Sequence, residues 1–152
     1  MFKVASWNLN SVRSRLTHVT AWLNVREPDG LLLQELKGTE FPSEAFKSLG
    51  YESVAVTQKA YNGVAILSRH AIDTVSKTLA GNEADSHARF LEVIIKGIRI
   101  VNIYLPNGNP VAVSYTHLRF SESRLSSSNL PSLTLSQGLC AMLSKRTKTC
   151  SK

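Results

Sequence analysis

Leu31-Leu32-Leu33-Gln34-Glu35 is the most informative stretch of the chain, because three consecutive leucines followed by polar residues predict a short strand buried on both faces. Before it, Phe2 to Trp7 alternates apolar and polar residues, as a half-buried strand does. Between these strands, apolar residues recur at helical spacing from Val12 to Leu23. The helix should end near Arg26, since Pro28 disfavours helical geometry in the residue before it. The beginning of the chain therefore predicts a strand–helix–strand unit.

Strand and helix signals continue to alternate as far as residue 104. Residues 41–49 are typical of a short helix ended by Gly50. Further strands are predicted at residues 51–57, 63–68, 72–78, 89–95 and 98–104. Gly97 allows a tight hairpin between the last two. We therefore expect one α/β domain over residues 1–111.

The character of the chain changes after Pro110. Residues 112–152 contain ten serines, six Lys/Arg and a single acidic residue, Glu122, and they show no sustained period. Residues 1–111 hold 12 Lys/Arg against 10 Asp/Glu, so most of the net charge of +7 falls in this irregular tail. Two interpretations of the tail stay open, a disordered basic segment or an out-of-frame translation joined to a genuine coding region. The basic charge is consequently weak evidence for nucleic-acid binding by the folded part.

Several function classes are disfavoured by the sequence. No apolar run approaches the roughly 20 residues that span a bilayer. The first eight residues lack the basic leader and continuous apolar stretch of a signal peptide. Cys140 and Cys150 form neither a zinc pattern nor a disulfide framework. We expect a cytoplasmic monomer with no membrane partner.

Three polar residues stand at the ends of predicted strands. Asn8 closes the first strand and Glu35 closes the leucine-rich strand. A β-α-β crossover would make these strands parallel, so both residues should lie at the same edge of the sheet. Ligand sites of α/β sheets favour that edge, and an amide oxygen beside a carboxylate suits Mg²⁺. Tyr104 also ends a strand, where its phenol can donate a hydrogen bond to a phosphate. Considered singly, each residue is more often an ordinary solvated or packed side chain than part of a site.

Five segments, in order along the chain, resemble the exonuclease III family of apurinic/apyrimidinic endonucleases. They are Ser6-Trp7-Asn8-Leu9-Asn10 with Val12-Arg13-Ser14-Arg15, Leu33-Gln34-Glu35-Leu36-Lys37, Phe41-Pro42 with Leu49-Gly50-Tyr51, residues 58–68, and Asn102-Ile103-Tyr104-Leu105-Pro106-Asn107-Gly108. Together they cover about residues 1–110. The resemblance implies the N-terminal part of a four-layer α/β sandwich of the endonuclease/exonuclease/phosphatase, DNase-I-like type. In that fold two sheets lie face to face with helices outside.

The resemblance also implies roles for the residues at matching positions. Glu35 becomes the direct ligand of Mg²⁺, for which Mn²⁺ can substitute, and Asn8 becomes a metal-site residue that supports the hydrogen bonds of the site. Tyr104 would contact the scissile phosphate or stabilise its transition state. The residues expected at the DNA are Asn10, Arg89 and Asn107. The implied activity is hydrolysis of phosphodiester bonds in double-stranded DNA, at abasic sites or from 3′ ends, as in base-excision repair.

The sequence departs from the family at two levels. Ser11, Leu36 and Ala60 stand where the family usually has Gly, Thr and Gly, and Leu36 fits as a tolerated change on the buried face of its strand. The family's later Gly-Asp-x-Asn motif, a further metal-site aspartate and the final Ser-Asp-His do not occur in these 152 residues. The resemblance assigns activation of the water to the first motif and charge stabilisation at the phosphate to the last histidine. We therefore expect an inactive or nearly inactive chain, and the abrupt loss of similarity favours the out-of-frame interpretation of residues 112–152.

Incomplete family coverage also has a structural implication. Half of a two-sheet sandwich would leave one sheet face without its partner, which favours aggregation or loose packing.

Two other function classes stay open. One is a phosphoesterase of the same fold that acts on phospholipid or inositol phosphates. The other is a non-enzymatic basic module whose tail binds nucleic acid or anionic surfaces. Residues 58–68, together with Arg13 and Arg15 at the start of the first helix, favour the DNA branch.

Overall fold

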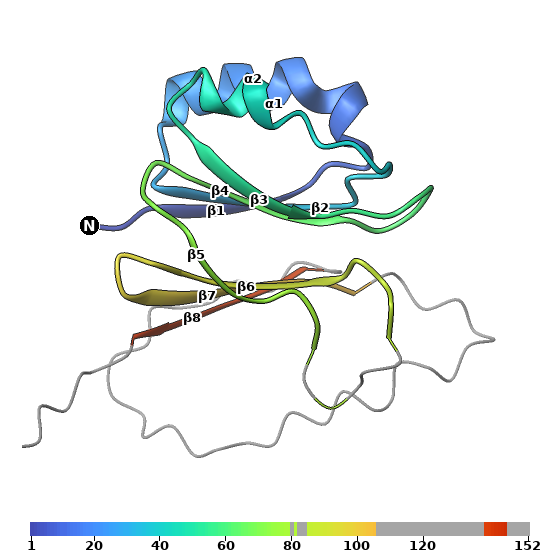
Figure 1. Cartoon of the computed structure of the whole chain (residues 1–152). Coiled ribbons are helices and arrows are strands. Elements are labelled where there is room, and N and C mark those ends of the chain that lie inside the picture. Colours follow the sequence, from blue (N-terminus) through green and yellow to red (C-terminus); the bar gives the residue numbers. More distant parts are fainter. Residues whose placement is uncertain (80, 82–84, 106–138, 146–152) are drawn as a thin grey trace, which may run out of the picture.

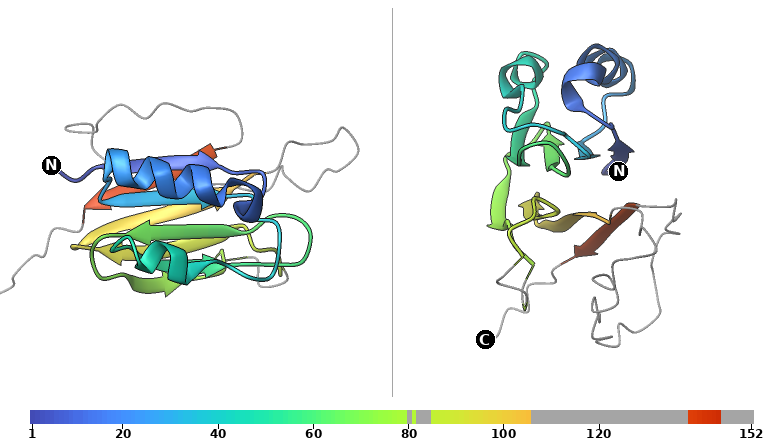
Figure 2. Two further views of the ribbon diagram at one scale, coloured as in Figure 1. Left: turned by 90° about the horizontal axis from the view of Figure 1, so that it is seen from above. Right: turned by 90° about the vertical axis from the view of Figure 1, so that its right-hand side faces the viewer.

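The computed structural model describes residues 1–79, 81, 85–105 and 139–145. These residues form two four-stranded sheets that lie face to face, with two helices over the outer face of the first sheet (Figure 1). The strand order is β1-β2-β4-β3 in the first sheet and β5-β6-β7-β8 in the second. A view along the sandwich shows the two helices side by side above the first sheet (Figure 2). The α/β class predicted from the sequence is confirmed.

Residues 1–68 build the first sheet and both helices. The elements are β1 (Val4–Asn8), α1 (Val12–Arg26), β2 (Gly30–Gln34), α2 (Ser43–Lys47), β3 (Glu52–Val56) and β4 (Val64–Ser68). β1 and β2 are parallel, with Asn8 opposite Gln34, as the predicted strand–helix–strand unit requires. α1 ends where Pro28 was expected to stop it, and Glu27 turns the chain in a left-handed conformation with φ 42°. Every residue of β2 and of β4 is buried, so the prediction of a buried central strand is confirmed.

The second sheet begins soon after the first is complete. Its strands are β5 (Asp73–Ser76), β6 (Phe90–Ile95), β7 (Ile98–Tyr104) and β8 (Leu139–Lys145). Lys96 and Gly97 form the predicted hairpin, and their φ values of 51° and 76° are those of a two-residue turn with both central residues left-handed. β8 pairs antiparallel with the whole of β7. The sequence pattern did not predict this strand, whose pairing satisfies the backbone groups along one edge of β7.

Two apolar cores hold the layers together. The first lies between the helices and the first sheet and includes Val19, Leu23, Leu31, Leu33, Phe46 and Leu67. The second lies between the two sheets and includes Leu32, Ile66, Leu91, Val93, Ile95 and Ile100. The expectation that one sheet face would lack its partner is therefore wrong for the inner faces. The chain enters the second sheet by residue 73, so four strands of each sheet are present.

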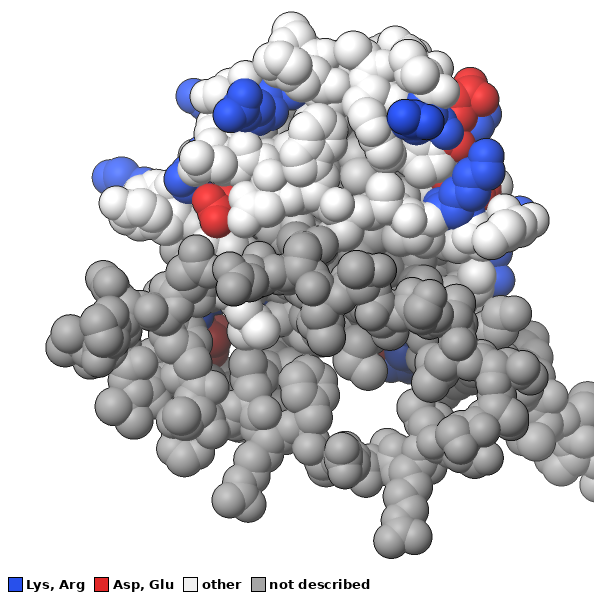
Figure 3. All heavy atoms as spheres, turned by 180° about the vertical axis from the view of Figure 1, so that it is seen from behind, with Lys and Arg blue, Asp and Glu red and all other residues white. Residues whose placement is uncertain are grey.

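The surface of the described residues carries mixed charge. Figure 3 shows basic and acidic side chains interspersed over the described part of one face. This agrees with the near balance of 12 Lys/Arg and 10 Asp/Glu in residues 1–111. Within the described ranges, no helix has both the length and the apolar character needed to cross a membrane.

Candidate active site

The carboxyl ends of β1, β2 and β7 meet at one edge of the sandwich. Asn8 is the last residue of β1, Glu35 directly follows β2, and Tyr104 ends β7. Asn8 Nδ2 donates a hydrogen bond of 2.8 Å to Glu35 Oε1, and Tyr104 Oη donates one of 2.9 Å to the same oxygen. The expected proximity of Asn8 and Glu35 is confirmed. Because β7 belongs to the other sheet, the Glu35 carboxylate also connects the two sheets.

The surroundings of Glu35 favour its ionised form. Burial by itself would raise the pKa of this carboxyl, but hydrogen bonds from Asn8 and Tyr104 and the nearby Lys37 charge hold the pKa below its ordinary value. Lys37 Nζ lies 3.5 Å from Glu35 Oε2 and also donates to Asn10 Oδ1. The Asn10 backbone N–H donates to Asn8 Oδ1 at 3.1 Å, so Asn8 meets the carboxylate with its amide nitrogen. The Glu35 side chain is 20% exposed, which leaves it open to a ligand.

Backbone strain is concentrated in the loops at this edge. Eight described non-glycine residues have positive φ, and six of them lie here: Asn10, Ser11, Glu35, Lys37, Ala60 and Asn62. Such conformations cost about 1–3 kcal/mol each and persist only where the surrounding structure holds them. The loops hold one another through backbone hydrogen bonds, such as Ser11 N–H to Glu35 O at 2.8 Å and Lys37 N–H to Asn62 O at 3.1 Å.

Two departures from the family pattern fall at these strained positions. Ser11 has φ 111° and Ala60 has φ 72°, conformations that glycine adopts without a steric penalty. The third departure, Leu36, is 1% exposed and packs in the first core. A Cβ added to Gly63 would lie only 2.8 Å from Leu36 Cβ, so glycine makes room for this leucine. Leu36 is thus buried, as expected, although it lies in the loop after β2 and not on the strand itself.

Arg89 lies beside Tyr104. The Tyr104 N–H donates to Arg89 O at 2.8 Å, which places the backbone of residue 89 next to the end of β7. The Arg89 side chain is 21% exposed, and Nη2 lies 3.9 Å from Asp85 Oδ1. Its Nε is buried without a hydrogen-bond partner among the described residues. Arg89 is therefore near the candidate site, whereas Asn107 lies outside the described residues.

Other charged candidates lie apart from this cluster of side chains. Arg13 and Arg15 are exposed on α1, and Arg13 Nη2 lies 2.6 Å from Glu40 Oε2. His70 Nε2 lies 2.9 Å from Asp29 Oδ1 at the opposite end of the first sheet. No group of three or more His, Cys, Asp or Glu in the described ranges could hold a metal ion.

Sequence reasoning missed two residues beneath the site, Gln34 and Asn102. Both are fully buried. Gln34 Nε2 donates to Ser6 Oγ at 3.0 Å and to Asn102 Oδ1 at 2.7 Å. A glutamine directly after three buried leucines was the available signal, because a buried polar side chain requires a partner.

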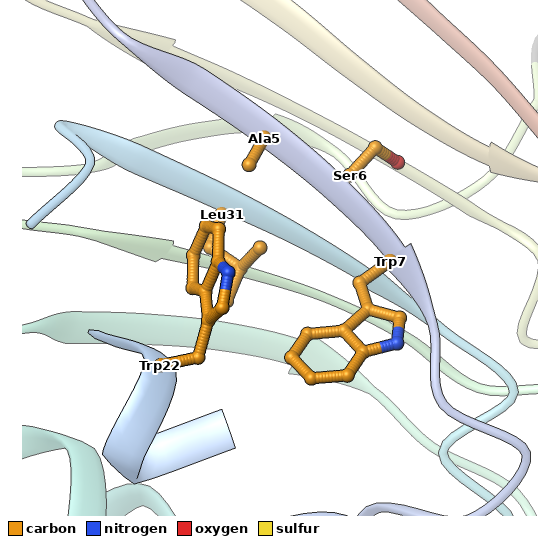
Figure 4. A pocket seen from close by; sticks show the side chains of 5 residues that line it. All are labelled: Ala5, Ser6, Trp7, Trp22 and Leu31. Carbon is orange, nitrogen blue, oxygen red and sulfur yellow. The ribbon is translucent and has the colours of Figure 1, made fainter. Parts of the chain in front are cut away.

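A hollow beside β1 is lined by Ala5, Ser6, Trp7, Trp22 and Leu31 (Figure 4). The rings of Trp7 and Trp22 meet edge to face with centroids 6.0 Å apart, and both side chains pack against the first core. The tryptophans are thus aromatic residues of the core, as the sequence indicated. The lining carries no charged group, so the hollow offers no chemistry of its own.

Comparisons with known proteins agree with this geometry. The model of the Endonuclease/Exonuclease/phosphatase family matches residues 5–148, a span that extends into the tail. Exodeoxyribonuclease III of Haemophilus influenzae is 30% identical over 112 residues, which cover 70% of this chain and 42% of that protein. The chain thus spans about two fifths of the length of this relative.

Solved structures give the same result. A 3′ phosphatase, NExo, from Neisseria, bound to a product DNA hairpin, has 38% identity and a TM-score of 0.69, covering 71% of this chain and 43% of that one. An AP endonuclease from Archaeoglobus fulgidus has 40% identity and a TM-score of 0.66, covering 70% and 42%. The predicted fold, the N-terminal part of this type of sandwich, is confirmed.

Proposed function

The chain belongs to the endonuclease/exonuclease/phosphatase family, with exonuclease III and AP endonucleases among its relatives, and on this basis we propose that its site serves divalent-metal-dependent hydrolysis of DNA. The substrate would be double-stranded DNA cleaved at abasic sites or from 3′ ends. We further propose that these 152 residues supply one side of that site and do not cleave DNA alone.

The observation that carries the proposal is the Glu35 carboxylate, held by hydrogen bonds from both sheets. Asn8 and Tyr104 both donate to Oε1, which leaves Oε2 facing only the Lys37 ammonium among the described residues. The pKa of Glu35 is lowered, so the side chain is anionic at neutral pH. An anionic, oriented and partly exposed carboxylate is suited to hold a cation against a phosphate.

The donor set fits Mg²⁺ or Mn²⁺. Mg²⁺ is often held by one or two carboxylates together with waters and substrate phosphates, so a single oriented Glu35 suffices as the protein ligand from this part of the chain. When bound, such an ion neutralises charge on the phosphate. Asn8 would orient the carboxylate through its amide nitrogen.

The Tyr104 hydroxyl is the group that we propose to meet the phosphate. In the structure it donates to Glu35, and rotation of that O–H toward a phosphate oxygen would keep it a donor. The backbone of Arg89 lies beside Tyr104, whose N–H it accepts, and we propose that the Arg89 side chain supplies a positive charge to the same phosphate. Donors and positive charge directed at a phosphate stabilise the charge that develops during its hydrolysis.

The proposal of inactivity rests on which groups the chain carries. The sequence contains neither the Gly-Asp-x-Asn motif that the family resemblance assigns to water activation nor the final Ser-Asp-His. The described residues supply the group that faces the cation and the donor for the phosphate. Among the described residues, no second carboxylate and no imidazole is hydrogen-bonded to Glu35 or Asn8 to accept the proton of water.

A cleavage assay on a duplex with one abasic site tests both proposals. Two proteins are assayed in the presence of Mg²⁺. One is the purified chain by itself, and the other is the chain fused to the part of Haemophilus influenzae exodeoxyribonuclease III that follows its matched segment. We expect the chain alone to match its Glu35→Gln variant. The fusion should cleave, and Glu35→Gln in the fusion should reduce the rate by at least roughly a hundredfold.

Three results would overturn the proposals. Cleavage by the chain alone at nearly the rate of a full-length relative would contradict inactivity. Faster hydrolysis of inositol phosphates than of DNA by the fusion would favour another phosphoesterase. Magnesium-independent DNA binding that weakens steeply with salt and disappears on deletion of residues 112–152 would favour a basic binding module.

A further inference from the structure

We propose that the buried amide pair Gln34–Asn102 is a positioning element that sets Tyr104 against Glu35 across the two sheets. The inference rests on the proposed function, because it concerns the same site. Gln34 directly precedes Glu35, and Asn102 stands two residues before Tyr104. The amide pair and the site are therefore carried by the same two strands, β2 and β7.

Asn102 connects its own sheet to two strands of the other. Its Nδ2 donates to Leu33 O of β2 at 3.0 Å and to Ala65 O of β4 at 2.8 Å. Its Oδ1 accepts from Gln34 Nε2 at 2.7 Å. Both amide side chains are fully buried, so water does not compete for these hydrogen bonds. One side chain of the second sheet is thus fixed to the two central strands of the first.

The orientation of both amides follows from the main chain. Two backbone carbonyls require donors, so Asn102 must direct Nδ2 toward them and Oδ1 toward Gln34. Gln34 must then present Nε2, which leaves its Oε1 buried without a partner among the described residues. An apolar side chain of similar size would avoid this unsatisfied acceptor. The amide pair therefore carries one unsatisfied buried acceptor among the described residues.

The amide pair provides directional hydrogen bonds between the sheets, which the surrounding apolar core does not. The core between the sheets is made of residues such as Leu32, Ile66 and Leu91, whose burial is non-directional and tolerates small shifts of one sheet over the other. Hydrogen bonds depend steeply on distance and angle. On β7, Asn102 and Tyr104 point to the same face, because side chains repeat with a period of two. Fixing Asn102 therefore fixes the position from which Tyr104 reaches Glu35.

A second connection between the sheets lies nearby and serves a different segment. Gly63 N–H donates to Ala88 O at 2.8 Å, and Ala88 N–H donates to Gln58 Oε1 at 2.6 Å. These bonds hold the loop that enters β6. They also reach the two strand ends of the site through the backbone, because Gly63 O accepts from Leu36 N–H and Arg89 O accepts from Tyr104 N–H. The amide pair differs in that it joins β2 and β7 directly, through buried side chains.

The test is whether the Glu35–Tyr104 interaction depends on Gln34. The coupling between the two residues is measured as the non-additivity of unfolding midpoints for Glu35→Ala, Tyr104→Phe and the double variant of the full chain. The cycle is repeated with Gln34→Met, an apolar replacement of similar length. It is also repeated with Ser6→Ala, which removes the other acceptor of the Gln34 amide but keeps the bond to Asn102.

We expect the coupling to fall by roughly half or more with Gln34→Met and to stay unchanged with Ser6→Ala. A purely structural role for Gln34 would lower every midpoint but leave the coupling intact, and that result would overturn the proposal. Equal loss of coupling with Ser6→Ala would overturn it as well. If Gln34→Met does not fold, Gln34→Asn keeps an amide but withdraws it from Asn102, and the same loss is expected.

The measurement separates this inference from the proposed function. It uses neither metal, DNA nor cleavage, so the coupling can depend on Gln34 even if the fusion protein is not a nuclease. Conversely, a fusion that cleaves DNA while Gln34→Met retains full coupling would support the function and reject the positioning role.

Discussion

An acidic residue with a lowered pKa lies at each end of β2, but the interactions that lower the pKa differ between the two ends. Asp29 stands before the strand, where Oδ2 accepts the Lys3 backbone N–H at 2.7 Å and Oδ1 contacts His70 Nε2 at 2.9 Å. The Lys3 and His70 hydrogen bonds lower its pKa against the opposing effect of burial. Both partners belong to the first sheet, since Lys3 precedes β1 and His70 follows β4. Glu35, after the strand, has partners in both sheets.

The difference between the ends lies in the use of the two carboxylate oxygens. Asp29 engages both oxygens with its own sheet and acts as a structural link. Glu35 accepts the Asn8 and Tyr104 hydrogen bonds on Oε1 alone, and its Oε2 meets only the Lys37 ammonium among the described groups. An acidic residue can therefore be equally well anchored at both ends of a strand, yet only one end retains an oxygen for a ligand. Structural and functional carboxylates are therefore better distinguished by whether one oxygen stays available to a ligand than by a lowered pKa alone.

The largest effect on the free energy of unfolding is expected from a change at the end of the sandwich that carries Glu35. Gly63 has φ 94°, and a Cβ there would lie 2.8 Å from Leu36 Cβ and 3.4 Å from Leu36 N. Gly63→Ala should therefore lower the free energy of unfolding by about 3 kcal/mol, from overpacking and backbone strain together. Chemical denaturation measures the loss.

Gly50→Ala is the matched control for that change. Gly50 has a similar φ of 80°, but nothing lies within 4 Å of the added Cβ. We expect only the conformational part of the loss, about 1 kcal/mol. Equal losses for the two variants would show that Leu36 is not tightly packed behind the Glu35 loop.

The sequence predicted the strands better than the contacts between them. Periodicity identified β1, α1 and β2, and the parallel unit placed Asn8 and Glu35 at one edge. It did not predict that Tyr104 would reach Glu35, because that contact joins residues 69 apart on two sheets. The relative position of two packed sheets depends on non-local packing, to which local patterns are insensitive.

The tail and the strained loops illustrate the same limit. β8 was not predicted, because a segment of five apolar residues followed by Ser144 and Lys145 forms a strand only if an edge is available to pair with it. The sequence could not predict the positive φ values of Glu35 and Lys37 either, since neither residue type favours that conformation. Gly50 and Gly97, in contrast, indicated their turns by residue type, because glycine adopts a positive φ without a steric penalty.

A smaller effect separates the two carboxylates directly. Asp29→Asn replaces one carboxylate oxygen with an amide nitrogen, which can only donate. If the remaining oxygen keeps the Lys3 N–H, the amide nitrogen faces His70 Nε2, and that contact survives only if the ring becomes an acceptor. We expect a loss of about 1–2 kcal/mol in the free energy of unfolding at neutral pH. Glu35→Gln keeps an oxygen that can accept from both Asn8 and Tyr104, so its loss should stay below about 1 kcal/mol.

The pH dependence of these losses provides the check. Both carboxyls have a lower pKa in the folded state, so each stabilises the fold above its unfolded pKa, and this contribution disappears as pH falls through the folded pKa. Denaturation measured from about pH 6 to pH 2 should show each variant approaching the parent protein at the acidic end. A difference that persists at pH 2 would mean that the variant acts through packing and not through the charge of Asp29 or Glu35.

The smallest expected effect concerns the backbone strain at the end of the sandwich that carries Glu35. Its relief should raise the free energy of unfolding, whereas the variants above lower it. Ala60 is exposed with φ 72°, so its only evident penalty is conformational. Ala60→Gly should raise the free energy of unfolding by about 0.5–1 kcal/mol, because relief of a left-handed alanine exceeds the added entropy of the unfolded glycine. The same substitution at Ala21, exposed within α1, should lower stability by about 1 kcal/mol, since glycine weakens a helix interior. Opposite signs for one chemical change would place the strain at the Glu35 end of the sandwich. A loss at both positions would mean that Ala60 is not strained in solution, and the contrast between the two ends of β2 would then rest on their carboxylates alone.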